Sequence, residues 1–138
     1  MKNNLALDFM KSLLLFCIAF VLLVTTAPIG FVYTLVRHLI LFKIRWLTIY
    51  FTEVAIALDA AGNVMMQHLL NDILLVKKEP TYYFGNKKET ISSVLGKNEL
   101  TNTLSALGKV LNGLLNMIDN GHSLNSIQYD VKRWRADN

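Results

Sequence analysis

The feature that most constrains this chain is an uncharged stretch near its start. Residues 12–36 contain no Asp, Glu, Lys or Arg, and Lys11 and Arg37 flank them. A helix needs roughly 20 apolar residues to cross the ~30 Å hydrocarbon core of a bilayer. In lipid, only helices and closed barrels satisfy every backbone polar group, and this stretch lacks the alternation of a barrel strand. We therefore predict an N-terminal transmembrane helix.

A cleaved signal peptide is the main alternative. Lys2 and Lys11 would form its basic region, and Leu13–Val24 would form its apolar region. The cleavage site is poor, because Ala27 is followed by Pro28 and apolar sequence continues beyond it. We therefore favour a retained anchor. The basic residues on both sides of the stretch slightly favour a cytoplasmic C-terminal part.

Composition supports a membrane protein rather than a nucleic-acid binder. Charged residues make up 17% of the chain, against a typical share of about 25%. Basic residues flank the apolar stretch, as they do beside membrane spans, so nucleic acid is not an expected partner. The expected partners are the lipid bilayer and a second copy or another membrane protein. We expect no cofactor. We expect no metal either, because the three histidines are far apart in the sequence.

The sequence predicts an all-α fold, with the N-terminal transmembrane helix followed by a small helical domain of three to four helices. Residues 1–43 are the predicted anchor, and residues 44–138 are the predicted domain. An apolar pattern with a narrow polar stripe continues to Val76 and predicts one long helix or two joined ones, so residues 44–76 are a candidate second, partly embedded helix. Pro80 ends it, and residues 81–88 are predicted to form a loop.

Further helices are predicted beyond this loop. Residues 89–95 form a short one that Gly96 ends, and Asn98 caps the next. Ser123 caps the last, with Trp134 facing inward. The helix that Asn98 caps is predicted to bury an apolar stripe with helical spacing. This stripe comprises Leu100, Leu104, Leu107, Leu111, Leu114 and Ile118.

A polar stripe runs along the predicted second helix, where Asp59, Asn63, Gln67 and Asn71 follow one another at four-residue intervals. Polar groups in an apolar bundle must find partners, so we interpret Asp59 and Asn63 as helix–helix hydrogen-bonding residues. Small residues in the same region permit close helix approach. Among them we select Ala57 and Ala61 as helix-packing residues.

A second polar cluster, at residues 89–93, contains Glu89, Thr90 and Ser92. Its structural interpretation is a turn whose hydroxyl groups cap a helix. The alternative is a hydrolytic site. Glu89 would then act as general acid or base with His122, Asp59 would orient one of them, and Asn63, Thr90 and Ser92 would bind substrate.

The middle of the chain resembles a family of small uncharacterised proteins of tailed phages and prophages. The resemblance covers residues 54–130. It lies in a D-x-x-x-N pattern at residues 59–63, the run G-N-K-K-E-T-I-S-S at residues 85–93, the pair Gly96-Lys97 and the pair Gly121-His122. Many members have a basic residue after the paired serines and a cysteine after the histidine, where this chain has Val94 and Ser123. The resemblance implies a phage origin and supplies no mechanism.

The leading functional hypothesis is a membrane-anchored helical protein of phage or prophage origin. It would act by helix association in the host inner membrane or a virion membrane, in lysis or assembly. The alternative is a membrane-tethered hydrolase that uses Glu89 and His122. A third hypothesis assigns lipid-surface or nucleic-acid binding to the basic, aromatic segment at residues 131–135.

Overall fold

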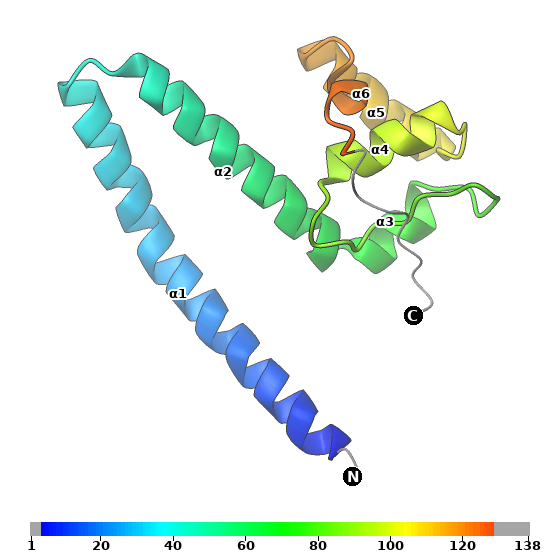
Figure 1. Ribbon diagram of the computed structural model, residues 1–138, viewed down its shortest axis with the longest axis horizontal. Helices are drawn as coiled ribbons and strands as arrows, with labels where there is room; N and C mark the ends of the chain where they lie inside the picture. Colours follow the sequence, from blue (N-terminus) through cyan, green and yellow to red (C-terminus); the bar gives the residue numbers. More distant parts are fainter. Residues whose placement is uncertain (1–3, 129–138) are drawn as a thin grey trace. The chain divides into compact units, whose positions relative to one another are not determined.

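The computed structural model describes residues 4–128 (Figure 1). Its helices, in chain order, are α1 (Leu5–Ile40), α2 (Ile44–Met65), α3 (Gln67–Ile73), α4 (Ile91–Leu100), α5 (Ala106–Ile118) and α6 (His122–Asn125). The only β-pairing that these residues show is an isolated antiparallel bridge between Leu75 and Leu104. The predicted fold class is confirmed: the protein is all-α, with a long apolar N-terminal helix followed by a helical domain.

The chain divides into two compact units between Phe51 and Thr52. We call Met1–Phe51 the N-terminal unit and Thr52–Asn138 the C-terminal unit. The predicted division, into residues 1–43 and 44–138, follows the turn between α1 and α2. The start of α2 belongs with α1 because the Phe31 ring lies 6.0 Å, centroid to centroid, from the ring of Phe51.

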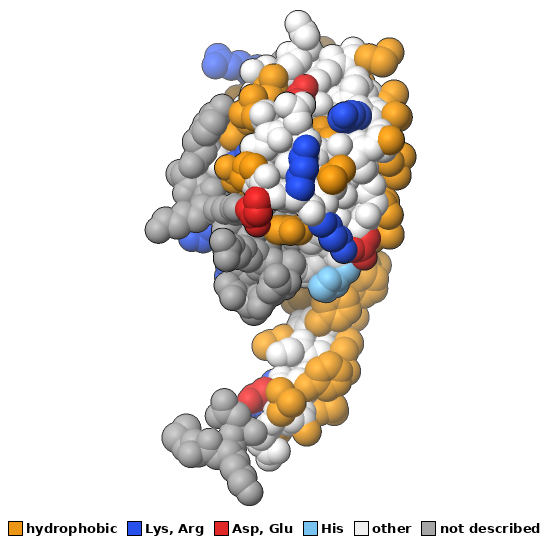
Figure 2. Space-filling model, turned by 90° about the vertical axis from the view of Figure 1, so that its right-hand side faces the viewer, with side chains coloured by type: hydrophobic (Ala, Val, Ile, Leu, Met, Phe, Trp, Pro, Cys, Tyr) orange, Lys and Arg blue, Asp and Glu red, His pale blue; other side chains and the backbone are white. Residues whose placement is uncertain are grey.

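The helix α1 contains the whole uncharged stretch and continues past it at both ends. It has 36 residues, none of which is buried, and it is therefore about 54 Å long at the α-helical rise. Figure 2 shows hydrophobic side chains along the lower part of this helix. Pro28 lies inside the helix. Nearby, the Thr25 and Thr26 hydroxyl groups donate hydrogen bonds to backbone carbonyls one turn earlier. Among the described residues, α1 is the helix that is by itself long and apolar enough to cross a membrane.

The predicted second embedded helix is divided into α2 and α3. The two helices together are long and apolar enough to span a bilayer, but their axes bend by 79° at the break. Met66 occupies this break. The pattern that continues to Val76 in the sequence is therefore that of two joined helices, one of the two arrangements that the periodicity permitted.

The C-terminal unit has its own small core. The buried apolar residues come from α3, from α4 and from the segments that follow each of them. They are Leu70, Leu74, Leu75, Phe84, Val94, Leu95 and Leu104. The long connection between α3 and α4, which includes the predicted loop at residues 81–88, thus contributes a core residue, Phe84, that is fully buried.

The helix α3 ends before the predicted stop at Pro80. Its last residue is Ile73, and the chain then pairs with the segment that precedes α5. The Val76 N–H donates to the Thr103 carbonyl at 2.8 Å, and the Ser105 N–H donates to the Leu74 carbonyl at 2.8 Å. The prediction was wrong here because this pairing comes from residues about 30 positions away, which local sequence does not reveal.

The boundaries predicted around α4 were also wrong. The helix begins at Ile91, passes through Gly96 and ends at Leu100. Gly96 is needed for close packing instead of helix termination, because a Cβ there would collide with the Ser123 backbone. Asn98 does not cap a following helix. It lies fully buried inside α4, where its side chain bonds the Tyr82 backbone.

The apolar stripe predicted for a helix from Asn98 is divided between α4, a turn and α5. Leu104 is buried before α5 begins, and Leu111 packs against the core from α5. The other members are exposed: Leu100, Leu107, Leu114 and Ile118. α5 is rotated from the predicted phase because Gly108 lies directly against the Leu74 carbonyl, leaving no room for a Cβ.

The predicted cap of the last helix was wrong as well. α6 begins at His122, with Gly121 in the left-handed conformation at its N-cap and Ser123 buried inside the helix. The side chain of Trp134, predicted to face inward, lies outside the described residues.

Candidate functional site

Asp59, on α2, caps the N-terminus of α4. Its Oδ1 accepts a hydrogen bond from the Ile91 N–H at 3.0 Å. Its Oδ2 accepts from the Ser92 hydroxyl at 2.7 Å and from the Ser92 N–H at 3.3 Å. A carboxylate is favoured at this position because the first N–H groups of a helix are unpaired and carry partial positive charge. Asp59 therefore joins α2 to α4 across 32 residues of sequence.

Thr90 completes this cap from within the chain. It is the N-cap residue of α4, and its side-chain oxygen accepts a hydrogen bond from the Ser93 N–H at 3.1 Å. The contacts of Thr90 and Ser92 in the C-terminal unit are therefore those of helix-capping residues.

Asn63, one helical turn after Asp59, organises the loop that precedes α4. Its Oδ1 accepts from the Gly85 N–H at 2.9 Å. Its Nδ2 donates to the Asn86 carbonyl at 3.0 Å and to the Glu89 carbonyl at 2.6 Å. The side chain is completely buried, so losing it would leave these backbone groups without partners. Gly85 has a φ of 124°, a conformation that suits glycine.

Two further asparagines hold the preceding segment by pairing with both polar groups of one peptide residue. Asn71 accepts from the Phe84 N–H at 2.7 Å and donates to the Phe84 carbonyl at 3.2 Å. Asn98 accepts from the Tyr82 N–H at 3.0 Å and donates to the Tyr82 carbonyl at 2.7 Å. Each side-chain amide therefore supplies the hydrogen bonds that an extended segment would otherwise receive from a partner strand.

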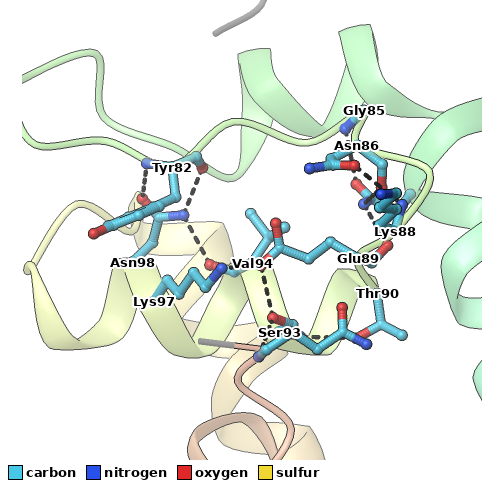
Figure 3. A network of polar contacts seen from close by, with 12 residues as sticks. Tyr82, Gly85, Asn86, Lys88, Glu89, Thr90, Ser93, Val94, Lys97 and Asn98 are labelled. Carbon is cyan, nitrogen blue, oxygen red and sulfur yellow. Dashed lines mark hydrogen bonds and ion pairs between the residues drawn. The ribbon is translucent and has the colours of Figure 1, made fainter. Parts of the chain in front are cut away.

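Glu89 and Lys97 form a buried ion pair in the same region as the contacts of Asn98 with Tyr82 (Figure 3). The Glu89 Oε1 is 2.5 Å from the Lys97 Nζ and accepts a hydrogen bond from the Ser93 hydroxyl at 2.7 Å. The side chains of Glu89 and Lys97 are only 3% and 7% exposed. The Lys97 Nζ also lies 5.6 Å from the centroid of the Tyr82 ring, within the range of a cation–π interaction.

His122 lies at the start of α6, and its Nδ1 is 3.2 Å from the Asp119 Oδ2. It lines a pocket of about 320 Å³ in the C-terminal unit. Asp59 and Thr90 line the same pocket, together with residues of α2 and of the region from α6 to Gln128. The structure therefore places three of the residues of the hydrolytic hypothesis, Asp59, Thr90 and His122, on one pocket.

Glu89, the general acid or base of that hypothesis, is not among the pocket-lining residues. Its carboxylate is occupied by Ser93 and Lys97, and Asp59 is occupied by the start of α4. This geometry gives Glu89 a structural role, and the hydrolytic pair of Glu89 and His122 stays a prediction. Among residues 4–128, no group of three His, Cys, Asp or Glu side chains is placed to hold a metal ion.

Ser93 and Lys97 were not predicted as partners of Glu89. A signal was present, because residues 89, 93 and 97 follow one another at four-residue spacing, which places side chains in line on a helix. The other candidates lie elsewhere. Ala57 and Ala61 are exposed on α2, and the basic segment at residues 131–135 lies outside the described residues.

No protein-family model, curated protein or solved structure matches this chain. The resemblance to small phage proteins therefore stays a prediction from short motifs. Three of the motif residues nevertheless act on the same part of this structure. Asp59, Asn63 and Glu89 all act on the start of α4 or the loop before it, so they form the frame of the C-terminal unit.

Proposed function

We propose that this is a membrane-anchored helical protein that acts by helix association within a membrane. The observation that carries the proposal is α1, in which none of the 36 residues is buried. Apolar surface in water costs about 25 cal/mol per Å², so an exposed helix of this composition requires an apolar environment. The C-terminal unit has a separate core and does not need α1 to bury its own apolar residues.

The proposed location is a bacterial inner membrane or a virion membrane, and the proposed role is in lysis or assembly by a phage or prophage. The motifs at residues 59–63, 85–93 and 121–122 support this origin. Helix association is supported by α2, where Ala57 and Ala61 are both exposed. They lie one turn apart on the same face, and small residues at such spacing let helix backbones approach closely.

The membrane location is tested with the full chain expressed in bacteria. We expect the protein to stay with the membrane pellet after an alkaline carbonate wash, which removes peripheral proteins, and to be released by detergent. Its intact mass should include residues 1–27, because we propose a retained anchor. Recovery in the carbonate supernatant, or a mature N-terminus near Pro28, would contradict the proposal.

Helix association is tested by enlarging the small residues. Ala57→Leu and Ala61→Leu should each lower the fraction of oligomer in detergent, because a leucine side chain separates the two helix backbones. Sedimentation of the detergent-solubilised full chain measures the oligomer size. Ala106, on α5, is also exposed, so Ala106→Leu is the matched control and should leave the size unchanged. An oligomer that both α2 variants retain at the wild-type size would count against association through this face.

A further inference from the structure

The helix α5 has a second apolar face that the core of the C-terminal unit does not use. Leu111 and Leu115 pack against the core from one side of the helix. Five large apolar side chains of α5 are instead each more than half exposed, from 52% at Leu107 to 86% at Ile118. We call them the outer face of α5, and they are Leu107, Val110, Leu114, Met117 and Ile118.

The outer face is one continuous stripe and not a scatter of single residues. On an α-helix its five positions fall within an arc of about 100°, which is the width of the apolar stripe that a surface helix normally buries. Lys109, which is exposed and lies outside this arc, is the sole charged residue of α5. An apolar stripe on a helix whose polar side carries lysine suits the plane of a membrane interface, where the lysine amine can reach the headgroups.

The size of the outer face favours lipid over a second copy of the chain as the surface that covers it. The helix has 13 residues, so it is about 20 Å long and about 10 Å wide, and one face covers roughly 200 Å². A stable protein interface needs about 800 Å² from each partner. A bilayer contact can be smaller, because an anchored α1 holds the C-terminal unit near the membrane and raises the effective concentration of lipid around it.

We propose that the outer face of α5 lies on the surface of the bilayer that α1 crosses. Its five apolar side chains enter the boundary between headgroups and acyl chains, while Leu111 and Leu115 keep their places against the core. This inference rests on the proposed function, because α1 supplies the attachment. The C-terminal unit is then held at the membrane by a second contact and is not a freely tethered domain.

The test is spin labelling of the full chain in vesicles of phosphatidylethanolamine and phosphatidylglycerol. A single nitroxide is attached to the cysteine of the Cys17→Ser/Val110→Cys or the Cys17→Ser/Leu114→Cys variant. Both positions are exposed, so the C-terminal unit tolerates the label. Power saturation compares the access of oxygen, which concentrates in lipid, with the access of a nickel chelate, which stays in water. We expect high oxygen and low nickel access, at a depth of about 5–10 Å in the interface.

Two reference positions calibrate this measurement. Lys78 is exposed and lies outside α5, so a label on Cys17→Ser/Lys78→Cys should show the reverse, with high nickel and low oxygen access. A label on Cys17 of the otherwise unchanged chain reports whether α1 is in lipid. Its nickel access should be low, as the proposed anchor requires.

The reference at Cys17 separates the failure of this inference from the failure of the proposed function. Nickel access at positions 110 and 114 equal to that at position 78, with Cys17 in lipid, would overturn the inference and leave the anchor intact. Nickel access to Cys17 itself would contradict the anchor and, with it, the inference. Low access of both reagents at positions 110 and 114 would mean that protein covers the outer face, and would also overturn the inference.

Discussion

Replacing Lys97 with methionine should destabilise the C-terminal unit by about 3–5 kcal/mol. The substitution keeps an unbranched side chain, one atom shorter than that of lysine, but leaves the Glu89 carboxylate, which is 3% exposed, without its cation. A lone buried charge is far more costly than either a complete ion pair or an apolar replacement. Urea unfolding of the full chain in detergent, followed by the near-ultraviolet circular dichroism of its tyrosines, measures this loss.

The chain supplies a matched control for this prediction. Lys77 pairs with Asp72 at 3.0 Å, but both side chains are about two-thirds exposed, at 68% and 65%. The hydrogen bond and charge of Asp72 raise the pKa of Lys77, yet an exposed pair contributes little to folding. Lys77→Met should therefore leave the urea midpoint nearly unchanged.

A double variant separates the ion pair from simple packing. Glu89→Gln combined with Lys97→Met removes both charges, so most of the stability lost in Lys97→Met should return. Equal losses in Lys77→Met and Lys97→Met would show that the Glu89–Lys97 pair does not stabilise the frame of the C-terminal unit.

Gly96→Ala should destabilise the same unit by roughly 1–3 kcal/mol or more, although alanine is the better helix former. A Cβ at Gly96 would meet the backbone of Ser123 and lie 2.9 Å from the Ile127 side chain. Because backbone cannot yield as a flexible side chain can, α4 and α6 must separate. The same urea titration gives the size of the effect.

Substitution of Gly113, inside α5, by alanine is the control, and we expect it to have the opposite effect on stability. Nothing lies within 4 Å of a Cβ at Gly113, so Gly113→Ala should stabilise the protein by roughly 0.5–1 kcal/mol through helix propensity. A stabilising effect at both glycines would mean that α4 and α6 do not pack as closely as described.

The long apolar helix could be predicted from sequence because its signal is local and cumulative. Each residue of the uncharged stretch adds to the same conclusion, and no distant partner is needed to confirm it. The loop between α3 and α4 was also predictable, since Pro80 and Gly85 both interrupt regular structure. The path that the loop takes was not predictable.

The frame of the C-terminal unit depends on contacts between residues far apart in the sequence. The four-residue spacing placed Asp59, Asn63 and Asn71 on one face of a single helix. This is correct for Asp59 and Asn63, which lie on α2, but Asn71 lies on α3, beyond the 79° bend. Apart from the Ser92 hydroxyl, their partners are backbone groups 13 to 33 residues away, and no periodicity identifies a backbone partner. Asn98 was misread for the same reason, because an asparagine that pairs with an extended segment resembles a helix cap in sequence.

The face of α5 that packs against the core could not be predicted from sequence for a different reason. Apolar residues occur on more than one face of this segment, since Val110 is exposed and its neighbour Leu111 packs against the core. Several stripes with helical spacing therefore fit the sequence. The packed face is selected by Gly108, where the helix contacts the carbonyl of Leu74. The close approach at a single glycine determined which stripe became buried.

The central claim, that α1 lies within a membrane, can be tested with Cys17, the single cysteine of the chain. Cys17 lies in the uncharged stretch of α1 and is exposed in the isolated chain. The measurement is labelling of the Cys17 thiol by a water-soluble maleimide in intact membranes. The comparison is a Cys17→Ser/Lys78→Cys variant, whose thiol at position 78 is labelled in membranes made permeable to the reagent. The account predicts that Cys17 stays unlabelled until a denaturing detergent is added, while the cysteine at position 78 reacts at once. Equal labelling of both thiols before detergent would show that α1 lies in water and contradict the account.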